Sequence, residues 1–235
     1  MKKQHLTDFD SLVPERTNSY EPIAYSTLTE IVKGHCNDFF NDDPTNFNFT
    51  TDTKGNKFFG TLTYKHPVNS DIDYMIGFRT SYDKSISNQF CAGGQVIVCS
   101  NMMFVGDVYT SRKHTTYMMN DIDDKITELL SGVKQEFTVM ERDINIMQQI
   151  EMSNERAAEL LGTLTFNKHI IGSSTANKAW ETWKKSKFDG SGAYDERNVW
   201  RLYNSITETT KNSNPLTAFN VHRNLHKFFT NTEQY

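Results

Sequence analysis

Apolar and polar residues alternate through the centre of the chain, and the period of that alternation changes near residue 115. Lys57–Lys65 and Asp73–Thr80 place apolar side chains mostly at every second position, which is typical of a half-buried β-strand. A third strand is expected over Ile86–Cys99. From Met118 to Ile150 the apolar residues recur at steps of three, four or seven, which predicts one long amphipathic helix.

The flanking segments show other patterns. Residues 1–25 are polar and contain two prolines, which predicts an extended arm. A short helix is expected from Ser26 to a stop at Gly34, followed by a loop over 37–56 that is rich in turn-forming residues. Beyond Ser153, a good helix N-cap, further helical patches are expected over 178–187, 199–209 and 216–229.

These elements predict an α+β fold. Its core is a three-stranded antiparallel β-sheet packed by a long amphipathic helix, in the order β-β-β-α, with helical N- and C-terminal additions. Short connections favour antiparallel pairing of neighbouring strands. The Gly93-Gly94 pair inside the third strand indicates a bulge or a close backbone approach, and Gly132 marks a possible break in the long helix. The predicted divisions are an arm over 1–25, a core over 26–152 and a helical region over 153–235.

Length and composition fit a globular protein. The chain has 235 residues, 37% of them hydrophobic, and no apolar run approaches the roughly 20 residues that span a bilayer. No signal peptide is apparent at Met1, so we expect a cytoplasmic protein without a membrane partner. Three cysteines cannot all pair within one chain, and we expect buried thiols. A zinc site from Cys91, Cys99 and His114 is the alternative, although its spacing matches no standard ligand pattern.

Charge is distributed in blocks of alternating sign. The net charge of −4 argues at first against a nucleic-acid partner. However, the balance is −5 over 1–53, +3 over 54–114, −6 over 115–159 and +4 over 160–235. An acidic protein can therefore still present a basic surface, formed by the strand region and the C-terminal region. Solvated faces of mixed sign remain the other interpretation.

Common catalytic motifs are absent from the sequence. It contains no P-loop, no G-x-S-x-G, no H-E-x-x-H and no G-x-G-x-x-G after a strand, so we expect no catalytic residue, no cofactor and no metal. His222 and His226 share a helical spacing that could bind a metal, but no nearby residue in the sequence completes a site. The least strained enzymatic alternative is a metal-dependent nuclease built on Asp71, Asp73 or Asp83.

Basic residues interleaved with aromatic rings are the candidate binding residues. Such a mixture can neutralise phosphates and stack bases of a single strand. In the strand region and the C-terminal region, the candidates for nucleic-acid binding are Lys57, Lys65, Arg79, Tyr82, Lys84, Arg112, Lys113, Lys184, Lys185 and Lys187. The alternative is that the rings pack in the core and the lysines are solvated.

Four stretches of the sequence carry a family resemblance. They are Gly77–Ser85, Gly94–Phe104 with its Val-Cys-Ser-Asn, Arg112-Lys113-His114, and Asn198–Glu208 with its Leu-Tyr-Asn-x-x-Thr-Glu. Together they resemble the core signature of a phage- and plasmid-borne family, a domain of unknown function, over most of residues 20 to 210. The β-β-β-α order is more distantly similar to the layout of single-strand annealing recombinases, which form rings or filaments and hold DNA in a basic groove.

The resemblance implies a homo-oligomeric protein that binds and anneals single-stranded DNA in recombination, replication or repair, without nucleotide hydrolysis. Layout alone does not fix function. The alternative is a phage interaction protein that inhibits or modifies a host factor. If nucleic acid binds, it should contact the strand region and the C-terminal lysines and avoid the acidic outer face of the long helix.

Overall fold

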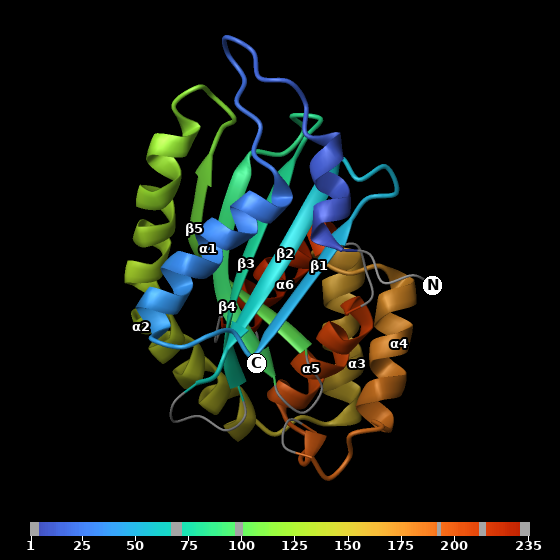
Figure 1. The fold of residues 1–235 in the computed structure, drawn as a ribbon. Coiled ribbons are helices and arrows are strands. Elements are labelled where there is room, and N and C mark those ends of the chain that lie inside the picture. Colours follow the sequence, from blue (N-terminus) through green and yellow to red (C-terminus); the bar gives the residue numbers. More distant parts are fainter. Residues whose placement is uncertain (1–4, 67–71, 97–100, 192–193, 212–214, 231–235) are drawn as a thin grey trace. The chain divides into compact units, whose positions relative to one another are not determined.

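The computed structural model describes residues 5–66, 72–96, 101–191, 194–211 and 215–230. Helices and strands follow one another along the chain as Figure 1 shows. In order they are the 3-10 helix η1 (Leu6–Leu12), α1 (Tyr25–Phe40), β1 (Asn46–Thr51), β2 (Lys57–Tyr64), β3 (Ile72–Ser81), β4 (Asn88–Val96), β5 (Asn101–Arg112), α2 (Met118–Gln149), α3 (Asn154–Gly162), the π-helix η2 (Thr163–Asn167), α4 (Ser173–Lys184), α5 (Val199–Thr210) and α6 (Pro215–Thr230).

The sheet has five antiparallel strands in the order β1-β2-β3-β4-β5, so the predicted three-stranded sheet is wrong. Strand β1 lies within the stretch predicted as a loop and pairs with β2, with Phe47 opposite Leu62. Its Asn and Thr residues obscured the alternation of its two phenylalanines. The predicted third strand over Ile86–Cys99 corresponds to β4 alone, whereas no strand was predicted over the residues that form β5. The α+β character of the protein remains.

Helix α1 lies across one face of the sheet (Figure 1) and is longer than predicted. Tyr25 at its start stacks on Phe58 of β2 at 4.7 Å, and Phe40 at its end stacks on Tyr64 at 4.5 Å. Gly34 does not stop the helix, because the contact of Phe40 with the sheet stabilises the helical turns that follow the glycine. The helix ends instead at Asn41, which has a left-handed φ of 54°.

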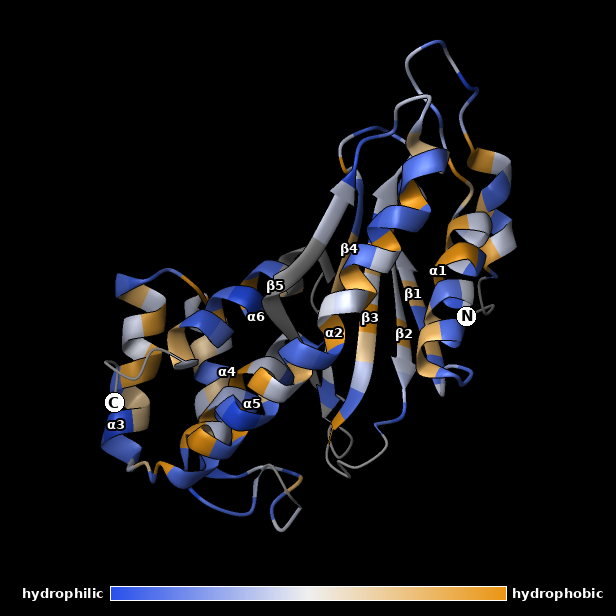
Figure 2. Ribbon diagram, turned by 90° about the vertical axis from the view of Figure 1, so that its left-hand side faces the viewer, coloured by the Kyte–Doolittle hydropathy of each residue, from blue (hydrophilic) through white to orange (hydrophobic). Residues whose placement is uncertain are grey.

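Helix α2 confirms the predicted long amphipathic helix and continues unbroken through residue 132. Hydrophilic and hydrophobic stretches alternate along it in Figure 2. Its apolar stripe is buried, as the hydrophobic pattern predicts: Ile122, Ile126, Leu129, Leu130, Val133, Phe137, Met140, Ile144 and Met147. The stripe explains why a helix with an acidic outer face is stable in this position.

The chain forms two compact units, each made of several segments. The first contains residues 1–67, 74–93 and 108–134, and the second contains 68–73, 94–107 and 135–235. Strands β3, β4 and β5 and helix α2 each contribute to both units. The predicted division at residues 25 and 152 stays a prediction, because contacts within one structure do not show which segments fold on their own.

Helices α3 to α6 belong to the second unit. Ser153 caps α3 as predicted, since its Oγ accepts a hydrogen bond from the N–H of Arg156 at 3.2 Å. The patches predicted at 199–209 and 216–229 are α5 and α6, whereas α4 begins at Ser173 rather than at Lys178. Among the helices of the described residues, none is both long enough and apolar enough to cross a membrane.

Two side chains, rather than another backbone, lie close to Gly94 of the predicted glycine pair. A Cβ atom at this position would lie 2.8 Å from Cγ2 of Ile72 and 2.8 Å from Cε of Met140. Glycine therefore allows β4, β3 and the second half of α2 to pack closely within the second unit.

Candidate functional site

Tyr20 and His114 bring the turn after β3 and the end of β5 together in the first unit. The ring centroids of Tyr20 and His114 are 5.7 Å apart, and the Tyr20 hydroxyl donates to the carbonyl of Tyr82 at 3.0 Å. Nε2 of His114 donates to the carbonyl of Ile86 at 2.9 Å. Two basic segments that lie far apart in the sequence, around Lys84 and around Lys113, are thereby fixed at one end of the sheet.

His114 fills a structural role in this arrangement. Burial lowers the pKa of its imidazole, and the hydrogen bond to the carbonyl of Ile86 only partly offsets that effect. The ring is therefore neutral at pH 7 and serves as a hydrogen-bonded support for its neighbours.

Lys84, Arg112 and Lys113 are the predicted site residues that this support gathers, and they differ in how they are held. Lys84 has a left-handed φ of 64°, and its Nζ lies 4.2 Å from the centroid of the Tyr20 ring. Arg112 forms an ion pair with Asp121 of α2, with Nη2 and Oδ2 at 2.5 Å. Lys113 is exposed, and no hydrogen bond or ion pair of its side chain occurs within the described residues.

Carboxylates near these cations are largely engaged. Asp83 accepts hydrogen bonds from the N–H and the hydroxyl of Ser85, at 2.9 and 2.5 Å. Slight burial raises the pKa of Asp83, but these hydrogen bonds and the charge of Lys57 outweigh it and keep the pKa below its ordinary value. Glu21 pairs with Arg16 at 3.3 Å. Neither Lys84 nor Lys113 forms an ion pair with a carboxylate of the described residues, so the charges of these two exposed side chains remain available to a ligand.

Tyr82 is a core residue, so the prediction that its ring faces a ligand is not supported by its position. Its ring stacks on Tyr25 with centroids 4.0 Å apart, and its hydroxyl accepts a hydrogen bond from the Tyr25 N–H at 3.2 Å. Burial, the largest cause, raises the pKa of Tyr82 to about 12. This arrangement makes Tyr82 a structural link between the β3–β4 turn and α1.

Tyr117 is the exposed ring that the sequence reasoning missed. It is 69% exposed and lies in the turn between β5 and α2, four residues after Lys113. The turn is tight, since the N–H of Thr115 donates to the carbonyl of Lys113 at 2.9 Å. A signal was present in the sequence, because Tyr117 precedes the apolar stripe of the helix and so belongs to neither periodic pattern.

Lys57, Arg79 and Lys65 occupy three further positions on β2 and β3 or at their ends. Lys57 lies opposite Ser81 and Arg79 lies opposite Phe59, both toward the end of the sheet that carries Lys84. The side chain of Arg79 donates from Nε to Gln89. Lys65 follows the other end of β2, roughly 25 Å away along an extended strand. The structure therefore separates Lys65 from the other predicted residues of this unit.

In the second unit, the three C-terminal lysines lie at the end of α4. Lys184 is its last residue, and Lys185 and Lys187 follow it. Lys184 bonds to Glu181 at 2.8 Å and lies over the Trp180 ring at 5.6 Å. Lys187 pairs with Glu208 at 3.1 Å and lies over Phe188 at 4.8 Å. Lys185 is exposed. Trp183 is fully buried. This segment therefore exposes its lysines and part of the Trp180 indole, but not the Trp183 ring.

His222 and His226 are buried in α6 and bind protein groups. Nε2 of His226 lies 3.4 Å from Oδ2 of Asp143, a residue of α2. Nε2 of His222 lies 2.6 Å from Oγ1 of Thr210, which itself donates to the carbonyl of Thr207. Asp143 was not found from the sequence because it is far away in the chain. Within the described residues, no group of three potential ligands could hold a metal ion.

The remaining chemical candidates are not assembled by the described residues. Cys91 is buried and donates to the carbonyl of Gly77 at 3.4 Å, and burial raises the pKa of its thiol to about 12. Cys99 and Asp71, named for the zinc and nuclease alternatives, lie outside the described residues. Asp83 is held by Ser85 as described above. An absence of catalytic residues therefore stays a prediction.

The comparisons with known proteins give one match. Residues 18–231 match the family described as Domain of unknown function (DUF932), and the chain therefore belongs to that family. No curated protein and no solved structure shows significant similarity. The predicted membership of a domain-of-unknown-function family is confirmed, whereas phage or plasmid origin and kinship with annealing recombinases stay predictions.

Proposed function

We propose that this member of the DUF932 family binds single-stranded DNA and presents it for annealing, in recombination, replication or repair, without nucleotide hydrolysis. One observation carries the proposal. Lys84 and Lys113, two exposed cations fixed around Tyr20 and His114, occur on the same unit as the exposed ring of Tyr117. We name Lys84, Arg112, Lys113 and Tyr117 the turn cluster.

The turn cluster combines the two interactions that sequence-independent binding of a single strand requires. Cations neutralise phosphates and release counterions, while an exposed ring stacks on a base of any type for about 1–3 kcal/mol. Lys113 and Lys84 supply the first, and Tyr117 supplies the second. Binding by these groups needs neither a metal nor a nucleotide cofactor.

Acidic side chains of α2 define where a strand would not bind. In the first unit Asp121 pairs with Arg112 and Asp123 bonds to His35 at 3.0 Å. The other carboxylates of the helix's outer face repel phosphates. A strand is therefore expected to lie over the turns rather than along the helix.

Assembly into a homo-oligomer is part of the proposal. The cluster of one chain spans only a few nucleotides, so affinity for a long strand requires several copies of it acting together. Mass measurement with and without a single-stranded oligonucleotide tests this point, because a ring or filament differs greatly from a monomer. A phage or mobile-element origin belongs to the same proposal.

A polarisation titration with a labelled oligothymidylate of about 20 nucleotides tests the binding. Affinity should fall steeply between about 50 and 200 mM salt, as counterion release requires. Lys84→Glu and Lys113→Glu should each weaken binding and lower the slope of log affinity against log salt by about 0.7 or more, the value for one phosphate contact with a single strand.

Lys65→Glu is the matched control for the titration. Lys65 is also an exposed lysine at the end of a strand, so this variant carries the same change of charge at the other end of β2. It should leave affinity within about twofold of the wild type. Equal losses for Lys65→Glu and Lys113→Glu would show attraction by total charge alone, and no binding at low salt would rule out the proposed function. If no oligonucleotide binds, capture of a host protein would support the interaction-protein alternative, provided that nuclease treatment does not abolish the capture.

A further inference from the structure

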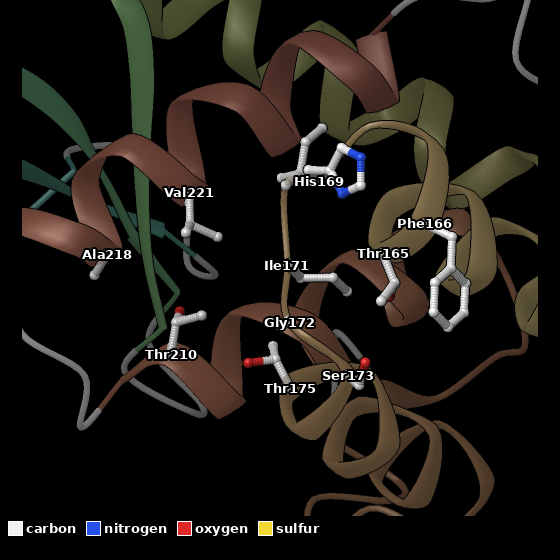
Figure 3. Close-up of a pocket in the computed structure, with 11 residues that line it drawn as sticks. Thr165, Phe166, His169, Ile171, Gly172, Ser173, Thr175, Thr210, Ala218 and Val221 are labelled. Atoms are coloured by element: carbon white, nitrogen blue, oxygen red, sulfur yellow. The ribbon is translucent and has the colours of Figure 1, made fainter.

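Two adjoining cavities form a groove in the second unit. The larger, of about 440 Å³, is shown in Figure 3, and the smaller measures about 260 Å³. Both are lined by Thr165, Phe166 and Ser173, so they meet at these residues. The larger continues to Thr210 and Val221, and the smaller to Trp180. A volume of 440 Å³ lies in the range of sites that hold small organic ligands.

Phe166 is the residue where the two cavities meet, and its ring is 69% exposed. It lies in the π-helix η2, and Thr165 beside it is buried with its hydroxyl donating to the carbonyl of Leu161 at 2.7 Å. His169, which lines the larger cavity, has a left-handed φ of 52°. A π-turn followed by a residue in this conformation is a locally unfavourable backbone that occurs often at functional sites.

Charge around the groove favours an anionic ligand. From Leu160 to Trp180 the chain contains Lys168 and Lys178 but no Asp or Glu, and this stretch supplies most of the lining of both cavities. No lining residue of either cavity is a carboxylate. In a protein with a net charge of −4, a groove whose lining carries no carboxylate repels a phosphate-bearing molecule less than the acidic parts of the surface do.

Hydroxyl groups in the larger cavity provide hydrogen bonds for the edge of a ligand. The hydroxyl of Thr210 is already engaged, since it donates to the carbonyl of Thr207 at 2.8 Å and faces Nε2 of His222 at 2.6 Å. The hydroxyls of Ser173 and Thr175 also line this cavity, as Figure 3 shows, and neither forms a hydrogen bond within the described part of the chain. Two hydroxyls that donate and accept can match the polar edge of any nucleobase.

We propose that this groove is a nucleobase-binding subsite for single-stranded DNA. A base stacks on the Phe166 ring, and its polar edge meets the hydroxyls of Ser173 and Thr175. The inference rests on the proposed function and deepens it, because it adds to the turn cluster of the first unit a second contact with single-stranded DNA. A planar ring beside hydroxyls that can donate and accept hydrogen bonds fits a nucleotide better than an apolar peptide segment, which would leave these hydroxyls unpaired.

Photocrosslinking with an oligothymidylate that carries a single 5-iodouracil tests the subsite in the full-length chain. Iodouracil couples on irradiation to aromatic rings that stack on it, and the modified peptide is identified by mass spectrometry. We expect a crosslink at Phe166. Phe166→Ala should remove it and weaken binding of the oligonucleotide by about 5- to 150-fold, the range that stacking of one base gives, whereas Phe166→Tyr should retain both.

Ile146→Ala is the matched control, since Ile146 is an exposed apolar residue of the same unit, on α2, and its truncation should change neither readout. Phe166 is exposed, so its truncation leaves folding intact, and an unchanged melting temperature verifies this. If the chain binds the oligonucleotide but Phe166→Ala has wild-type affinity and crosslinks fall only on Tyr117, the subsite is wrong and the proposed function stands. If the wild-type chain does not bind the oligonucleotide, both are wrong.

Discussion

Helix α2 supplies carboxylates to ion pairs in both units, and two of these pairs have opposite surroundings. In the first unit the side chains of Asp121 and Arg112 are 43% and 28% exposed. In the second unit those of Asp143 and His226 are 9% and 7% exposed. An exposed pair is screened by water and contributes little to stability, whereas each partner of a buried pair depends on the other. Helix α2 therefore neutralises a surface cation in the first unit and stabilises the core of the second unit.

Removing the buried carboxylate should have the largest effect. In Asp143→Ala the imidazole of His226 loses its acidic partner inside the second unit, and leaving a buried polar group without its partner costs up to about 3 kcal/mol. We expect the free energy of unfolding, measured by urea denaturation at pH 7, to fall by that amount. Asp123→Ala, a change on the exposed face of the same helix, should cost less than about 1 kcal/mol. A similar small loss for Asp143→Ala would show that the buried pair does not stabilise the unit.

Acid should weaken the second unit through His222. Burial lowers the pKa of its imidazole to about 4, below the value of about 6.5 in an unfolded chain. Between these values the unfolded chain binds a proton that the folded chain does not, so stability is complete above pH 6.5 and falls as the pH is lowered toward 4. The pKa difference corresponds to about 3 kcal/mol.

Urea denaturation at several pH values between 7 and 4.5 measures this dependence. His222→Gln keeps a side-chain N–H near Thr210 but cannot be protonated, and it should lose most of the dependence. Asp143 does not interfere in this window, because the bonds from His226 and Arg142 outweigh its burial and place its pKa below the ordinary value for a carboxyl. His114 acts in the same direction as His222, since burial lowers its pKa as well. An equal pH dependence in His222→Gln would assign the effect to other groups.

Most of the elements could be predicted from the sequence, but the extent of the sheet could not. The apolar stripe of α2 is long and regular, and so one helix could be predicted over 118–150 almost to its ends. Strand β1 has six residues in which only Phe47 and Phe49 are apolar, and its stability depends on pairing with β2 rather than on its own pattern. Pairing between strands is a long-range interaction that a local period does not contain.

For the candidate site, charge was easier to predict than exposure. Lys84, Arg112 and Lys113 were found because basic residues stand out in the sequence. Alternation could not distinguish Tyr82, whose ring stacks on Tyr25 of α1, from Tyr117, whose side chain is mostly exposed. The support from Tyr20 and His114 was missed for the same reason, since it joins segments more than 90 residues apart.

Removing the exposed carboxylate of Asp121 should have the smallest effect on stability. It should also strengthen the binding of single-stranded DNA. In Asp121→Asn the side chain keeps its size but no longer neutralises Arg112, and the free energy of unfolding should change by less than about 1 kcal/mol. The guanidinium then becomes available to a phosphate. Affinity for the oligothymidylate should rise, and the slope of log affinity against log salt should become steeper by about 0.7, which corresponds to one additional contact.

Asp124→Asn is the control for this last change, because Asp124 is an exposed carboxylate of the same helix with no ion pair to Arg112. It removes the same negative charge and should leave the slope within error of the wild type. Arg112 is paired with Asp121 at 2.5 Å. The guanidinium of Arg112 therefore becomes available to a phosphate only when that ion pair is lost. An equal gain in both variants would mean that the acidic helix repels the strand as a whole, and an unchanged affinity in Asp121→Asn would remove Arg112 from the binding surface.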